Sequence, residues 1–206
     1  MTARILLALS LSGFFFASGA AHCATATAVA DVSASAVIAA AKGPEKITIT
    51  VNAGHVEIAT ASVKLVGDSV GDKRYYHRGA GGPALVEVKS ESAGFKLRAP
   101  DSKLLWKIKI GDDKIKVSDN EQNANAWAIK TDHADKAKLV DPAEHAIGEV
   151  KFSKETGKIK IKDGSDVEQF VIEAGKSSAA YGVLLMSGIP RESALVIVAE
   201  LMARGH

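Results

Sequence analysis

Seven of the nine lysines in two short segments are the residues whose spacing points most directly to a binding chemistry. In "LLWKIKIGDDKIKVSDN" (104–120) and "KFSKETGKIKIKD" (151–163), lysines alternate with apolar residues beside a turn. Residues two apart share one face of a β-strand, so each segment predicts a hairpin with an apolar face and a basic face. The basic positions are Lys107, Lys109, Lys114, Lys116, Lys158, Lys160 and Lys162.

Two interpretations of this lysine row are open. One is a cationic wall that binds phosphate, lipid head groups or acidic glycans. The other is the solvated outside of a sheet, where lysines also discourage association between strand edges. Between Asp101 and Asp163 the chain has thirteen lysines and twelve acidic residues. Because neighbouring acids cancel much of the field, this balance favours the solvated face, and weak binding to an anionic surface stays a hypothesis.

A second set of residues suits a metal or hydrolytic site. Asp132 and His133 lie a dozen residues before Glu144 and His145, and carboxylates and imidazoles are ligands that zinc accepts. The sequence has no HExxH motif, no GxSxG elbow and no GxGxxG phosphate loop to support such chemistry. We therefore expect no catalytic residue, no bound metal and no cofactor, with a secreted enzyme that uses an unrecognised acidic or histidine site as the alternative.

The elements that carry these residues are short strands. From Lys46 onward, segments of alternating apolar and polar residues are separated by turn residues, and a hairpin pattern repeats with drift. Ile108 and Ile110 in the first lysine segment correspond to Val150 and Phe152 in the second. The pattern predicts a mainly β fold, an antiparallel barrel of about a dozen strands built from repeated hairpins.

The C-terminal segment changes to a helical pattern. Pro190 suits a first helical position and Arg204 a helix end, so we expect a helix over 190–204, with a further turn or two over 179–186. A helix without a polar face is normally buried on all sides, so we expect this one to pack inside the barrel. Its core positions are Leu195, Val196, Ile197, Val198, Leu201 and Met202.

The N-terminal thirty residues have the layout of a secretory signal peptide. Arg4 precedes an apolar run, which small residues follow. The run is shorter than the ~20 residues that a transmembrane helix needs. Lipidation of Cys23, the only cysteine, is disfavoured because His22 does not fit a lipobox. We expect a signal peptide over 1–30, an Ala/Ser-rich spacer or short helix over 31–45, and a single β-rich domain over 46–206.

The two lysine hairpins, together with "ALVIVAELMAR" near the C-terminus, resemble the tubby-like β-barrel of the tubby, LURP-one and phospholipid-scramblase families. The resemblance is architectural, covers about Lys46 to Arg204, and implies a closed antiparallel barrel around a hydrophobic helix. It also implies a scaffold associated with membrane lipids, proteins or regulation rather than with one reaction type. The export signal departs from these families, whose familiar members act inside cells, so a phosphoinositide-type function does not transfer.

The net charge and the predicted export signal restrict the expected partners and location of the protein. The formal net charge of +2 requires neither nucleic acid nor an anionic membrane as a partner. We expect an exported protein, periplasmic or secreted, that binds anionic envelope components or another envelope protein, or has a structural role there, with no transmembrane helix after signal removal. The alternatives are the secreted enzyme and a lipid-surface module that carries hydrophobic ligands inside the barrel.

Overall fold

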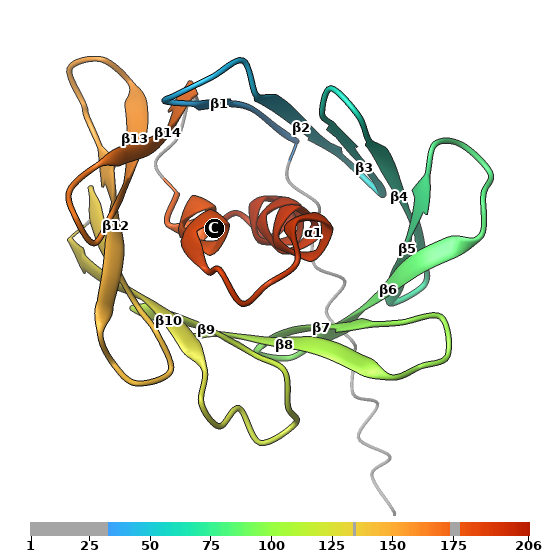
Figure 1. The fold of residues 1–206 in the computed structure, drawn as a ribbon. Helices are drawn as coiled ribbons and strands as arrows, with labels where there is room; N and C mark the ends of the chain where they lie inside the picture. The colour runs from blue at the N-terminus through green and yellow to red at the C-terminus, as the bar shows by residue number, and fades with distance from the viewer. Residues whose placement is uncertain (1–32, 134, 174–177) are drawn as a thin grey trace, which may run out of the picture.

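A closed antiparallel barrel forms the body of the protein (Figure 1). The computed structural model describes residues 33–133, 135–173 and 178–206. Each strand pairs with its neighbours in sequence, and β1 closes the ring against β14. The strands are β1 (Ala34–Ala40), β2 (Lys46–Asn52), β3 (His55–Ala59), β4 (Lys64–Val70), β5 (Lys73–Arg78), β6 (Ala84–Glu91), β7 (Gly94–Arg98), β8 (Leu104–Ile110), β9 (Lys114–Ser118), β10 (Trp127–His133), β11 (Lys136–Val140), β12 (Ala146–Phe152), β13 (Lys158–Asp163) and β14 (Glu168–Glu173).

The predicted strand number was wrong: the barrel has 14 strands rather than about a dozen. Among the described residues, the strand missing from the prediction is β1, which lies in the segment expected to be a spacer. Ile38 stands opposite Ile47 of β2 and Ile172 of β14, and its side chain is buried. The alanines and serine of β1 give a weak strand signal, but backbone pairing on both sides removes the open edges of β2 and β14. The barrel therefore begins at Ala34 rather than at Lys46.

The signal peptide predicted over 1–30, with Cys23 inside it, lies outside the described residues. Among the described residues, no helix has the length and apolar character needed to cross a bilayer.

The two predicted lysine hairpins are present. Ile108 of β8 stands opposite Val117 of β9, and Val150 of β12 stands opposite Ile161 of β13. All four side chains are buried, as the period of two predicts for the apolar face. The lysines alternate with them and therefore lie on the outer face of the barrel.

Two helical segments follow the last strand, η1 (Ala180–Leu185) and α1 (Arg191–Ala203). Both match the segments predicted from the sequence, and Pro190 directly precedes α1. Every residue from Ala194 to Ala203 is buried, which includes the six predicted core positions. Figure 1 draws η1 and α1 within the outline of the ring of strands.

Close contacts join this C-terminal segment to the wall. A Cβ on Gly188, between η1 and α1, would lie 2.5 Å from the Trp127 ring, and a Cβ on Gly148 would lie 2.6 Å from Cδ1 of Leu185. Side chains at these two positions would separate the helical segment from β10 and β12. Trp127 in turn meets Trp106 edge to face, with ring centroids 6.2 Å apart.

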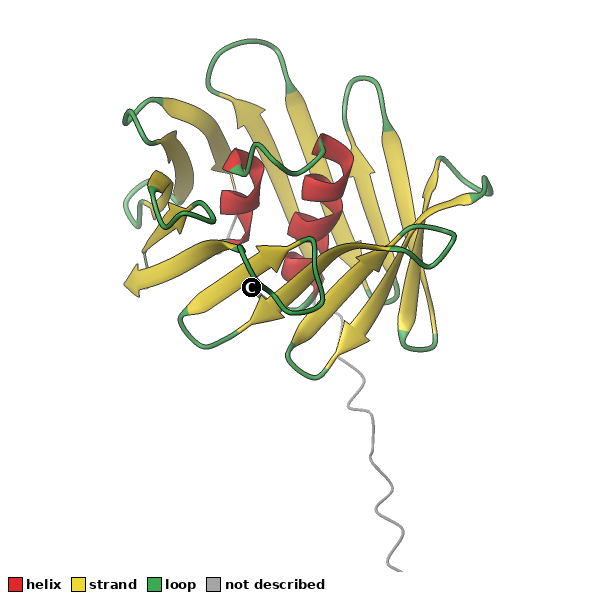
Figure 2. Cartoon of the chain, turned by 60° about the horizontal axis from the view of Figure 1, so that its bottom comes forward, coloured by secondary structure: helices red, strands yellow, loops and turns green. Residues whose placement is uncertain are grey.

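The barrel has two distinct ends, with the connecting loops gathered at them (Figure 2). Because consecutive strands are antiparallel, turns after odd-numbered strands lie at one end and turns after even-numbered strands at the other. α1 begins at the first end, where Arg191 pairs with Glu45 of the β1–β2 turn at 2.6 Å. We call this the Arg191 end. The chain finishes at the other, the His206 end, where His206 lies near Gly111 of the β8–β9 turn.

Candidate functional site

A buried ionic cluster joins α1 to the barrel wall. Glu200 has 0% of its surface exposed, and its Oε1 accepts hydrogen bonds from Arg74 Nη1 and Tyr76 Oη of β5, both at 2.7 Å. Arg204, one helical turn further on, also pairs with the Glu200 carboxylate. It donates to Ser90 Oγ of β6 at 3.0 Å. We call Arg74, Tyr76, Ser90, Glu200 and Arg204 the interior cluster.

Packing and burial set the chemistry of this cluster. Burial, and then the nearby Glu200 carboxylate, raise the pKa of Tyr76 well above its ordinary value, so the phenol stays a neutral donor. Gly67 makes room for the Tyr76 ring, because a Cβ there would lie 2.7 Å from it. The Arg204 guanidinium lies over the Phe95 ring, 4.4 Å from its centroid.

The interior cluster is suited to positioning rather than to catalysis. The Glu200 carboxylate is already engaged by three donors and has no exposure to a substrate. The hydrogen bonds between Glu200 and β5 fix the position of α1 along the helix axis. Sequence reasoning missed this cluster. The available signal was Glu200 itself, a carboxylate inside an apolar helix, which a buried environment tolerates only with charged or hydrogen-bonding partners.

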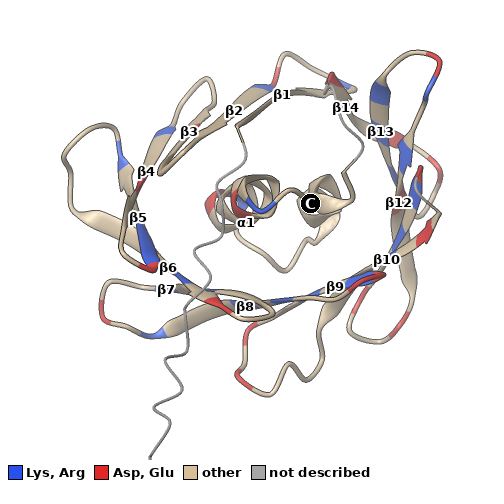
Figure 3. Ribbon diagram, turned by 180° about the vertical axis from the view of Figure 1, so that it is seen from behind, with Lys and Arg blue, Asp and Glu red and all other residues tan. Residues whose placement is uncertain are grey.

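The seven lysines predicted as a row differ in their partners. Four of them are in ion pairs with acids: Lys107 with Glu121 (3.7 Å), Lys158 with Glu173 (3.2 Å), Lys160 with Glu168 (2.8 Å) and Lys162 with Asp166 (2.8 Å). Within the described part of the chain, Lys109, Lys114 and Lys116 are in no ion pair. We call these three residues of β8 and β9 the lysine patch. Figure 3 shows basic segments, in blue, along many of the strands.

Like charges face each other at the lysine patch. Lys109 stands directly opposite Lys116, and Lys114 stands directly opposite Lys130 of β10. Lys130 in turn pairs with Glu144 at 2.5 Å. The hydrogen bond from Lys130 lowers the pKa of Glu144 most, and the charges of Lys114 and Lys116 lower it further. One carboxylate is thus shared by several cations on this wall.

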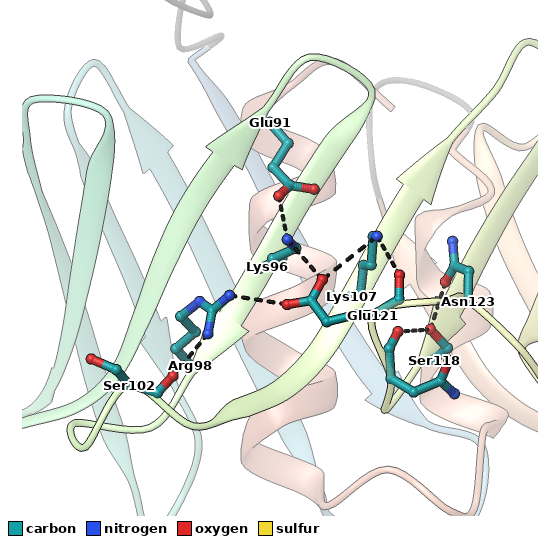
Figure 4. A network of polar contacts seen from close by, with 9 residues as sticks. Glu91, Lys96, Arg98, Ser102, Lys107, Ser118, Glu121 and Asn123 are labelled. Atoms are coloured by element: carbon teal, nitrogen blue, oxygen red, sulfur yellow. Dashed lines mark hydrogen bonds and ion pairs between the residues drawn. The ribbon is translucent and has the colours of Figure 1, made fainter.

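On β7 and β8, by contrast, three cations each form an ion pair with a single acid (Figure 4). Glu121, in the β9–β10 loop, pairs with Lys96 at 2.8 Å, with Arg98 at 3.1 Å and with Lys107 at 3.7 Å. Lys96 also pairs with Glu91 at 2.6 Å. The hydrogen bond from Lys96 is the main reason that the pKa of Glu121 is lowered. We call these five residues the Glu121 network.

The acidic and histidine residues considered for a metal or hydrolytic site do not come together. Asp132 and His133 lie where β10 finishes, at the His206 end, whereas Glu144 and His145 lie in the β11–β12 turn at the Arg191 end. Asp132 pairs with Lys138 at 2.8 Å, and His145 Nδ1 lies 3.3 Å from Asp141 Oδ2. Within the described ranges, no group of three or more His, Cys, Asp and Glu residues is placed to hold a metal ion.

In comparisons with known proteins, no family model, no curated protein and no solved structure matches the chain. The structure shares a closed antiparallel barrel with the tubby-like architecture that the sequence resembles. That agreement extends to the type of barrel and no further.

Proposed function

We propose that this protein is a non-catalytic binding protein of the cell envelope, exported by its N-terminal segment, which attaches to a phosphate-bearing anionic membrane surface through Lys109, Lys114 and Lys116. The observation that carries the proposal is the contrast within one lysine row. Four of the seven predicted lysines have acidic partners, and these three neighbours have none among the described residues.

Electrostatics explains why this contrast favours an anionic partner. Like charges directly opposite each other on adjacent strands are destabilising, and the lysine patch contains such a pair in Lys109 and Lys116. An anionic surface placed against the patch relieves that repulsion. Clustered lysines near an anionic bilayer are attracted to it within about one Debye length. We therefore expect weak, salt-sensitive attachment through the side of the barrel.

We further propose that α1 is the apolar core of the barrel, the arrangement that the tubby-like resemblance implies. The burial of Ala194 to Ala203, the close approach at Gly188 and the contacts of Glu200 with β5 support this. A barrel with its interior occupied has little room for an acyl chain, which favours the outer wall over the interior as the place where a partner binds. The separation of Asp132 and His133 from Glu144 and His145 favours binding over hydrolysis.

Co-sedimentation with vesicles tests the proposed function. Vesicles that contain phosphatidylglycerol should pellet the protein at low salt, and pure phosphatidylcholine vesicles should not. The variant Lys109→Gln/Lys114→Gln/Lys116→Gln should lose this binding. A matched control, Lys158→Gln/Lys160→Gln/Lys162→Gln, removes the same charge from the equivalent hairpin, where each lysine has an acidic partner, and should retain most of it.

Three outcomes would contradict the proposal. Binding that persists unchanged at about 0.5 M salt, where the Debye length falls to a few ångströms, would exclude the electrostatic mechanism. Equal losses in the two triple variants would show that overall charge, and not the lysine patch, is what matters. Pelleting with an acidic polysaccharide but not with anionic vesicles would replace the membrane by a glycan as the partner.

A further inference from the structure

A pocket opens at the His206 end of the barrel, beside the C-terminus of the chain. It has a volume of about 350 Å³, within the range of sites that hold small organic molecules. Its walls come from β9 to β12, the β8–β9 turn, the segment before η1 and the last two residues. The pocket lies away from the outer lysine patch except at Lys114, which lines it as well.

The lining of the pocket combines an apolar part with charges of both signs. Ile115, Ala137, Val150 and Phe152 supply apolar surface. Thr131, His133 and Ser178 supply groups that donate or accept hydrogen bonds. Asp112, Asp135 and Lys114 supply the charges, and none of these three is in an ion pair with another described residue. The other lysine of the lining, Lys136, is already paired with Glu149 at 2.6 Å.

From this lining we infer that the pocket binds a free apolar amino acid. Its ammonium group would meet the Asp135 carboxylate, its carboxylate would meet Lys114, and its side chain would lie on the apolar surface that includes Val150 and Phe152. A zwitterion leaves water only where both of its charges find partners. Asp135 and Lys114, which are in no ion pair with a described residue, and the apolar wall provide these partners. A simple amine or a simple acid would leave one charge without a counterpart.

The inference does not depend on membrane binding. Asp135 lies outside the lysine patch, so a change there alters the pocket without altering the proposed membrane contact. Asp132, three residues earlier in the chain, is a matched control, because it does not line the pocket and its carboxylate pairs with Lys138 on the outer face.

Titration of the ¹⁵N-labelled protein, followed by amide chemical shifts, tests the inference. The probe is L-leucine, compared with isoamylamine, which lacks the carboxylate, and 4-methylpentanoate, which lacks the ammonium group. Leucine should produce saturable shifts at Thr131, Ala137, Val150 and Ser178 and bind about tenfold more tightly than either analogue, as expected for the loss of one charged hydrogen bond. Asp135→Asn should weaken leucine binding about tenfold, and Asp132→Asn should not.

Specific results of the same titrations would contradict the amino-acid site. Equal affinity for leucine and isoamylamine would exclude a role for Lys114, and equal affinity for leucine and 4-methylpentanoate would exclude a role for Asp135. The absence of saturable shifts in the folded wild-type protein would exclude the site altogether. Because Asp135 is a turn residue at the barrel rim, a spectrum with retained dispersion will show that Asp135→Asn is folded. Lys114→Gln, tested against leucine, gives a second and independent variant.

Discussion

Glu200 and Glu121 each contact three donors, but Glu200 is buried and Glu121 is partly exposed. Glu200 contacts Arg74, Tyr76 and Arg204, and its side chain has no exposure. The cations around Glu121 are Lys96, Arg98 and Lys107, and 45% of its side chain is exposed. The contacts are similar, but water screens only the second group. A carboxylate with three donors therefore fixes the position of a helix when it is buried, but contributes little to stability when it is exposed to water.

A new buried charge without partners in α1 should cause the largest loss of stability. Ile197 and Glu200 lie one turn apart in α1, and both are fully buried. Ile197→Asp places a carboxylate where no donor has been provided, so we expect the domain to lose its cooperative unfolding transition. Circular dichroism during thermal denaturation measures this. Ile197→Leu, which conserves the volume, is the control and should remain folded. A normal transition in Ile197→Asp would contradict the burial of α1 in the core.

Removal of the buried Glu200 carboxylate should cause the second-largest loss of stability. Glu200→Gln keeps the shape of the side chain but takes the carboxylate away from Arg74 and Arg204. Breaking a buried ion pair by removing one partner costs about 3–5 kcal/mol, because the remaining charge is left uncompensated. Urea denaturation of the variant measures the free energy of unfolding. Glu121→Gln is the matched control, and a loss of equal size in both variants would remove the distinction between the two sites.

The position of Tyr76 offers a smaller test of the same cluster. Gly67→Ala introduces a methyl group 2.7 Å from the Tyr76 ring, which must then move away from Glu200. Overpacking of this kind costs typically about 1–3 kcal/mol. Gly82→Ala is the control, because a Cβ there would lie no closer than 3.4 Å to the nearest atom and its φ is not positive. Unchanged stability in Gly67→Ala would show that the ring is free to shift without loss.

Glu121, on the surface, should make the smallest contribution to stability, and that contribution should depend on pH. The pKa of Glu121 is lowered chiefly by its hydrogen bond from Lys96. A carboxylate with a lowered pKa in the folded state stabilises the fold above its unfolded pKa, and this contribution is lost as the pH falls through the lowered value. We expect NMR titration to show the Glu121 midpoint below that of an ordinary glutamate and to show it rising in Lys96→Gln. A midpoint that Lys96→Gln leaves unchanged would exclude this cause.

Sequence reasoning predicted the regular parts of this fold because their signal is local. Alternation identified the hairpins around Ile108 and Val150, and the missing polar face identified α1. β1 escaped because its alanines give little strand signal, and its pairing with β14 joins segments at opposite ends of the chain. The interior cluster escaped for a related reason: Arg74 and Glu200 are 126 residues apart in sequence, so only the closed barrel brings them together.

The candidate binding surface was predicted only in part. The period of two identified Lys109 and Lys158 alike as outward-facing residues, and both interpretations of the row treated them as equivalent. Which lysines have acidic partners depends on where loop and neighbouring-strand acids such as Glu121 and Glu173 come to lie, and that is set by turn geometry and strand register rather than by local sequence.

Lysine footprinting tests the central claim most directly. The protein is acetylated briefly with and without phosphatidylglycerol vesicles at low salt, and the modification of each lysine is quantified by mass spectrometry. We expect the vesicles to protect Lys109, Lys114 and Lys116 and to leave Lys158, Lys160 and Lys162 as reactive as before. Equal protection of the two sets, or protection confined to the second, would contradict the claim that the lysine patch is the surface through which this barrel binds.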